Sequence, residues 1–196
     1  KGAAMQKPTE EERADAAHWE AVEEATELLH EERFHEALTM LREILRADTK
    51  NPYAFYFTGV AMFEVGELTP ARDAYRACIA LAPKHVGARV ALSHVLRSLG
   101  EPRAAVKEGM AALALANDLG LVSGPNRRAD GDALHAVGLA HLADQNLGEA
   151  RKYLEAFLTT EPEFEVATEV RGILADLGAG APVLRAIDEE GEAGWN

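Results

Sequence analysis

The sequence is poor in several features on which whole classes of protein depend. It has one cysteine, Cys78, in 196 residues, so a disulfide framework within one chain is excluded. Aromatic residues make up only 6% of the chain, while alanine is abundant, a composition that suits closely packed helices. No apolar run reaches the roughly 18 residues of a membrane span. β-branched residues form no alternating runs, so we expect almost no sheet.

Positive charge is also scarce. Twenty Lys and Arg against 33 Asp and Glu give a net charge of −13. Nucleic acids and anionic membranes are bound through clustered cations, so neither is expected as a partner. The plainer interpretation of the charge is an acidic, solvated surface. No secretory signal is visible, and we expect a cytoplasmic location.

Motifs that carry chemistry are missing as well. Among the seven histidines, His135 and His141 are six residues apart and fall on different parts of a helix. There is no HExxH motif, no cysteine cluster, no GxSxG and no phosphate loop. Cys78 falls on the packing face of a predicted helix, as a buried hydrophobic residue would. We therefore expect no enzyme, no metal site and no cofactor.

The strongest pattern lies between residues 52 and 83 and predicts two helices joined by a tight turn. Gly66 separates two segments with helical periodicity, and Pro83 ends the second, because proline cannot continue a helix. Gly59 and Ala71 fall where the two antiparallel helices would cross. A larger side chain at either position would push the backbones apart.

This hairpin resembles the tetratricopeptide repeat (TPR), a unit of about 34 residues with small residues at its eighth and twentieth positions. Phe55 stands in place of the usual tryptophan, and Thr58 departs from the usual leucine. The residues that match the pattern are Gly59, Ala71, Tyr75 and Pro83.

Weaker copies of the same pattern fill most of the chain. Ala37 and Ala105 lie 34 residues before and after Ala71. The fold class implied by the resemblance is an all-α, right-handed superhelical solenoid of about four TPR repeats with a C-terminal capping helix. The predicted segments are a disordered or frayed start (1–14), a solenoid (15–177) with repeats 18–51, 52–85, 86–119 and 131–164, an insertion loop (120–130), a capping helix (165–177), and a short helix with an acidic tail (178–196). After the start of the chain, one long helix is expected to run to about His30.

The resemblance also implies which side chains face the concave groove, where TPR proteins bind peptides. The positions that chaperone-binding TPRs use to grip a C-terminal carboxylate hold no suitable donor here, which disfavours that ligand. Arg127 and Arg128 in the insertion form a candidate secondary contact. The expected groove residues are Trp19, Val22, Thr26, Tyr53, Tyr56, Phe57, Val60, Phe63, Val90, His94, Arg97, His135 and Leu139.

The predicted function is a non-enzymatic interaction module that binds a peptide or partner segment through apolar anchors in an aromatic groove. It would act as an adaptor, scaffold or chaperone, and the chain is loosely similar to the small TPR chaperones of bacterial secretion. Two alternatives stay open: a self-assembling homo-oligomeric scaffold, and a metal-binding or enzymatic protein. The sequence equally allows a fragment of a longer protein, or an N-terminal segment that occupies the groove.

Overall fold

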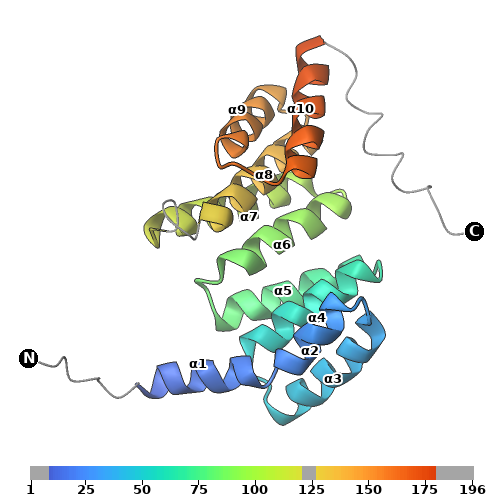
Figure 1. The fold of residues 1–196 in the computed structure, drawn as a ribbon, viewed down its shortest axis with the longest axis vertical. Helices are drawn as coiled ribbons and strands as arrows, with labels where there is room; N and C mark the ends of the chain where they lie inside the picture. The colour runs from blue at the N-terminus through green and yellow to red at the C-terminus, as the bar shows by residue number, and fades with distance from the viewer. Residues whose placement is uncertain (1–8, 121–126, 180–196) are drawn as a thin grey trace, which may run out of the picture. The chain divides into compact units, whose positions relative to one another are not determined.

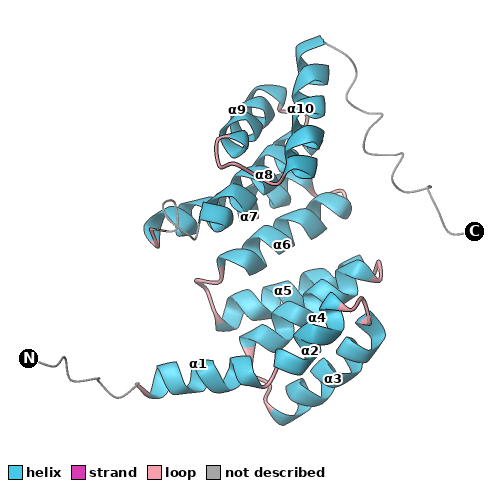
Figure 2. Ribbon diagram, viewed as in Figure 1, coloured by secondary structure: helices cyan, strands magenta, loops and turns pink. Residues whose placement is uncertain are grey.

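The computed structural model describes residues 9–120 and 127–179 and confirms the all-α expectation. These residues form ten helices and no strand (Figures 1 and 2). None of the described helices is long and apolar enough to cross a membrane. The chain divides into two compact units at Gly100–Glu101, a boundary inside the third predicted repeat. We call them the first unit and the second unit.

The first unit holds six helices, and consecutive helices from α2 to α6 pack on each other. The N-terminal helix α1 extends to one side of this unit and contacts α4 (Figure 1). The helices are α1 (Glu10–Glu20), α2 (Glu23–His30), α3 (Phe34–Ala47), α4 (Pro52–Glu64), α5 (Leu68–Leu81) and α6 (Val86–Ser98).

The second unit holds four helices, and α8 packs on both α7 and α9. Its core gathers Leu154, Phe157 and Val170 from α9 and α10. The helices are α7 (Pro102–Asp118), α8 (Arg127–Ala143), α9 (Leu147–Leu158) and α10 (Phe164–Ala179).

Two hairpins, one in each unit, cross at a glycine, as the repeat pattern requires. A Cβ atom on Gly59 in α4 would lie 2.6 Å from Cε1 of Tyr75 in α5, a side chain that is only 3% exposed. A Cβ atom on Gly138 in α8 would lie 2.6 Å from Cδ2 of the fully buried Leu154 in α9. The same positions of two repeats therefore bring helix backbones together with no room for a methyl group.

The turns inside the hairpins share a left-handed backbone residue. Gly66 and Gly100 take φ values of 79° and 74°, and Glu32 and Gln145 take 58° and 60° at the corresponding turns. Glycine adopts this conformation without steric penalty, whereas other L-residues are strained in it. Two of the four turns therefore hold a side chain at an energetic cost.

The N-terminal prediction needs two corrections. Residues 10–14 were expected to be disordered or frayed, but they form the start of α1, where Thr9 and Glu12 make a reciprocal capping box. A single helix was expected as far as His30, but the chain bends at Ala21–Val22 and starts again as α2. The bend lets Val22 and Ala25 enter the core with Leu41 and Ala54, while α1 turns toward α4. Residues 1–8 lie outside the described part.

The boundaries of the insertion and of the C-terminal segment also change. The insertion was predicted to be a loop from 120 to 130, but α8 already begins at Arg127, and residues 121–126 lie outside the described part. The final helix extends to Ala179 rather than ending at residue 177. The predicted short helix and acidic tail, from residue 180 onward, lie outside the described part as well.

Candidate functional site

A groove of about 390 Å³ opens in the first unit between the α2–α3 turn and one face of α4. One side of the groove, which we call the aromatic wall, is formed by Tyr56, Phe57 and Val60 of α4, and each of these side chains is half-buried. The opposite side is built by the end of α2 and the start of α3. The residues that line the groove are Thr26, Leu29, His30, Glu32, Phe34, Tyr56, Phe57, Val60 and Glu64.

The aromatic face of α4 is fixed by a strong helix start. The side-chain oxygen of Asn51 accepts a hydrogen bond from the Ala54 amide at 3.0 Å, and Pro52 occupies the first turn. The amide nitrogen of Asn51 donates to the His18 carbonyl oxygen at 2.9 Å. Asn51 is 1% exposed, so this one buried side chain both caps α4 and attaches α1 to it.

Helix α1 adds an aromatic edge beside the groove. The Trp19 ring lies 5.3 Å from the Tyr53 ring in a T-shaped arrangement and 6.0 Å from the Phe57 ring, centroid to centroid. The Tyr53 hydroxyl donates to Asp15 at 2.8 Å. Burial, with the bond to Asp15, raises the pKa of Tyr53 to about 12. Trp19 is still 44% exposed, so α1 borders the groove without filling it.

His85, the residue that precedes α6, links the aromatic wall to the start of that helix. The ring of His85 lies 4.7 Å from that of Tyr56, and its Nδ1 accepts a hydrogen bond from the Ala88 amide at 3.0 Å, which caps α6. An accepting Nδ1 must be unprotonated. Burial lowers the pKa of His85, which favours this neutral, capping form.

The structure brings four of the expected groove residues together in this groove: Thr26, Tyr56, Phe57 and Val60. Tyr53 and Trp19 lie beside it in the aromatic edge. Phe63 is half-buried on α4 but does not line the groove. Val22 does not face the groove at all: it is fully buried in the core, because the bend before α2 turns it inward.

The other expected residues lie elsewhere. Val90, His94 and Arg97 are half-buried on α6 and are not among the residues that line the groove. His135 and Leu139 belong to the second unit, where His135 stacks on Phe157 at 4.7 Å and Leu139 packs against the core. Helix α8 begins at Arg127. The side chains of Arg127 and Arg128 lie outside the described part.

The groove also includes two charged residues: the repeat register indicates Glu64, at the thirteenth position of its unit, but not Glu32. Glu32 is the left-handed residue of the α2–α3 turn, and Glu64 is the last residue of α4. Both are exposed and line the groove. The sequence could have pointed to Glu32 by its position, because Glu32 stands at the turn position where the next two repeats have glycine.

Within residues 9–120 and 127–179, no three histidine, cysteine or carboxylate side chains are grouped so that they could hold a metal ion. Cys78 is fully buried, and burial raises the pKa of its thiol to about 12, so it forms part of the core as expected.

No family model matches the chain, and no curated protein matches it either. Solved structures do. PilF of Pseudomonas aeruginosa matches with a TM-score of 0.69 and 17% identity, over 93% of this chain and 78% of that one. MamA from Desulfovibrio magneticus RS-1 matches with a TM-score of 0.62 and 19% identity, over 92% and 97%.

A structure described as that of a thermophilic TPR protein, TTC0263 of Thermus thermophilus, is similar over 83% of this chain and 82% of its own. Its TM-score is 0.58 and its identity 19%. With identities this low, the likeness bears on the fold. The chain has the fold of the TPR proteins, as the repeat pattern predicted.

Proposed function

We propose that the chain is a non-enzymatic adaptor that binds a segment of a partner protein through apolar anchors in the groove of its first unit. The observation that supports this proposal is the groove itself. Tyr56, Phe57 and Val60 stay half-buried at its wall, facing Leu29 and Phe34 across an open volume of about 390 Å³. Apolar and aromatic surface collected in a concavity is typical of a binding site.

The size of the groove suits a short ligand of moderate affinity. Burying one apolar side chain contributes roughly 1.5–3 kcal/mol, so three anchors would contribute roughly 5–9 kcal/mol. Ordering of the ligand and its loss of translational freedom offset part of this gain. Micromolar binding, about −8 kcal/mol, is therefore near the upper limit that the groove alone would support.

A peptide-display selection on the purified chain tests the proposal. We expect enriched peptides to share apolar anchors and to lose binding when Val60→Glu places a charge in the groove wall. Leu81→Glu is the matched control, since Leu81 is a 41% exposed apolar residue of the same unit that does not line the groove. Circular dichroism checks that both variants are folded. Peptides that bind the Val60→Glu variant as well as the wild type would refute the assignment of the groove.

One observation favours self-assembly as a second candidate function. Phe164, the first residue of α10, is 80% exposed, the highest value among the exposed large apolar residues of the described part. Light scattering over a range of protein concentrations would show a mass that rises with concentration in the wild type and stays monomeric in Phe164→Ser. A monomer at every concentration would exclude assembly through this residue.

A further inference from the structure

The groove combines its aromatic wall with negative charge. Glu32 and Glu64 both line it, and its lining contains no lysine or arginine. Within the described residues, neither carboxylate has an ion pair. The neighbouring Arg33 is engaged elsewhere: it binds Glu36 at 2.7 Å and Glu31 at 2.8 Å. The two groove carboxylates are therefore left for a ligand to neutralise.

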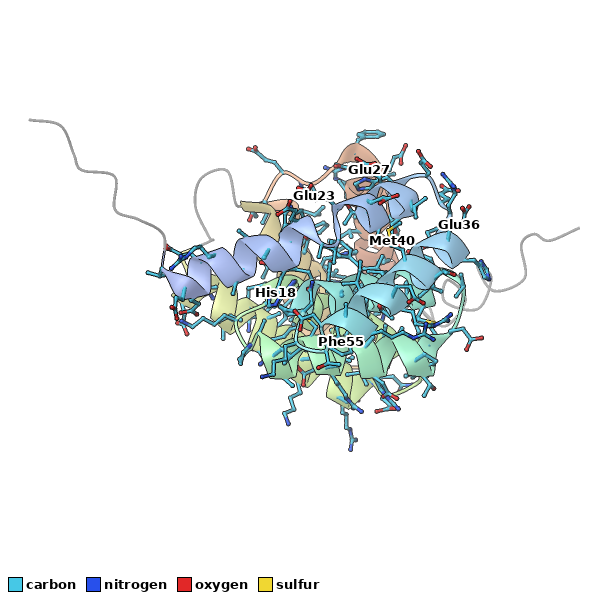
Figure 3. All side chains as sticks on the ribbon, turned by 90° about the horizontal axis from the view of Figure 1, so that it is seen from below. His18, Glu23, Glu27, Glu36, Met40 and Phe55 are labelled. Carbon is cyan, nitrogen blue, oxygen red and sulfur yellow. The ribbon has the colours of Figure 1, made fainter. Side chains whose placement is uncertain are left out.

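Helices α1 and α2, which border the groove, carry further charge of the same sign. Between Glu10 and Glu32 the sequence has ten carboxylates and one arginine, a net −9 out of the −13 of the whole chain. Figure 3 shows Glu23 and Glu27 on α2, the helix that forms one side of the groove, and both side chains are exposed. Such a concentration of one sign of charge attracts a ligand of the opposite sign and speeds its association.

The backbone of Glu32 holds this groove carboxylate in an unfavourable conformation, one that Gln145 and Glu161 share elsewhere in the described part. With a φ of 58°, Glu32 occupies the left-handed region where the next two repeats use Gly66 and Gly100. Glycine at this position would be less strained. A side chain kept in a strained conformation beside a groove is an observation from which a functional hypothesis can start.

We propose that the partner segment is basic as well as apolar, with Lys or Arg side chains that pair with Glu32 and Glu64 while its apolar side chains fill the space between Phe34 and Val60. This inference rests on the proposed function and specifies its ligand. Charge complementarity favours this ligand. An acidic or neutral apolar segment would lie beside Glu32 and Glu64 without giving either carboxylate a cation to pair with. Pairing at an exposed rim weakens as salt is added.

Three synthetic peptides of equal length test the proposal. All carry the same leucine and phenylalanine anchors, and their polar positions hold lysine, glutamine or glutamate. Binding is measured by fluorescence anisotropy at low and at moderate salt. We expect the lysine peptide to bind about tenfold more tightly than the glutamine peptide at low salt, with the advantage shrinking as salt is added, and the glutamate peptide to bind most weakly.

Variants separate the groove from the general acidity of the chain. Glu32→Gly with Glu64→Gln should weaken the lysine peptide about fivefold, as expected for the loss of two exposed ion pairs, and leave the glutamine peptide unchanged. Glu20→Gln with Glu67→Gln removes the same charge from the same unit outside the groove lining and should have a smaller effect. Equal losses in the two double variants would mean that the lysine peptide responds to overall charge, which would overturn the proposal.

The backbone strain provides a second readout. Glu32→Gly should raise the urea midpoint of unfolding while it weakens the lysine peptide. Gln145→Gly relieves the same kind of strain at the turn between α8 and α9 and should raise the midpoint without affecting the peptide. An unchanged affinity in Glu32→Gly would remove this carboxylate from the site.

The failure of this inference differs from the failure of the proposed function. If lysine and glutamine peptides bind equally and Val60→Glu abolishes both, the groove binds apolar segments without regard to charge, and only the inference is wrong. If no peptide is sensitive to Val60→Glu, the groove is not the binding site and both are wrong.

Discussion

Replacing Gly138 by alanine should destabilise the second unit, even though alanine is the better helix former. The new Cβ atom would lie 2.6 Å from Cδ2 and 2.7 Å from Cγ of Leu154, and 3.3 Å from its backbone nitrogen. Unstrained carbon atoms approach to about 3.5–4.0 Å, so the two helices or the leucine must move by about 1 Å. Leu154 is fully buried in one cluster with Phe157 and Val170, so a shift of its side chain disturbs the core of the second unit.

A control in the same unit isolates the cost of this overlap. Gly172 lies in α10, is exposed, and has nothing within 4 Å of the position where its Cβ atom would be. Both substitutions gain the same intrinsic helix preference, about 1 kcal/mol. Overpacking of a well-filled core costs about 1–3 kcal/mol, so Gly138→Ala should be less stable than Gly172→Ala by about that amount. Gly172→Ala should itself be more stable than the wild type.

Urea unfolding followed by far-UV circular dichroism measures this difference, provided that the slope of the transition is equal in the three proteins. A second comparison adds Leu154→Ala, in whose background Gly138→Ala should no longer destabilise, because the overlapping atoms are gone. If Gly138→Ala is as stable as Gly172→Ala, the helices α8 and α9 separate at little cost. The close crossing would then not be what holds this hairpin together.

Three further perturbations have defined outcomes. Asn51→Ala should lower the free energy of unfolding by about 1–3 kcal/mol in denaturant titrations, because it leaves the Ala54 amide and the His18 carbonyl without their partner. A change below about 0.5 kcal/mol, the size of a neutral surface substitution, would contradict this role. The pKa of His85 is lowered in the folded state. The contribution of His85 to stability should therefore be complete above about pH 6.5 and be lost as the pH falls through its folded-state pKa. His85→Asn should flatten this part of a pH–stability curve. Cys78 should react with a thiol reagent no faster than the protein unfolds; rapid labelling of the native protein would contradict its burial.

The repeat register was predictable because local chemistry marks it. Gly66 ends one helix with a left-handed turn, and the observed α4 and α5 begin and end within a few residues of the glycine and proline positions that the pattern uses. Gly59 against Tyr75 then follows from the rule that crossing helices need a small residue at the crossing. Such features depend on residue type at a fixed spacing, and one sequence is enough to recognise them.

The bend before α2 was not predictable in this way, because its cause lies in distant contacts. Neither proline nor glycine occurs between Glu10 and His30 to mark a break. The direction of α1 is set by Asn51, which holds the His18 carbonyl, and by Tyr53, which holds Asp15. The two residues of each pair are 33 and 38 positions apart in the sequence, and a local pattern does not carry information about them.

The same limit explains the mixed outcome at the site. Family register assigned one helical face of the first repeat to the groove, and Thr26 does line it. Val22 was assigned to that face too, yet it lies at the bend itself rather than inside a continuous helix, and it is buried against Leu41 and Ala54. A register argument holds only as long as the helix that carries it is unbroken.

Glu32 illustrates what a family pattern tends to conceal. Aligned by register, the turn residues Glu32, Gly66, Gly100 and Gln145 are equivalent, and a glutamate there looks like an imperfect copy of glycine. The geometry gives the substitution a different meaning, because a left-handed non-glycine residue costs roughly 1–2 kcal/mol and Glu32 alone among these four lines the groove beside α4. Gln145 bears the same strain without a place in that groove, so strain by itself does not mark the site. Among these four equivalent turns, the carboxylate, the strain and the aromatic wall coincide only at the first, and that coincidence favours a basic ligand.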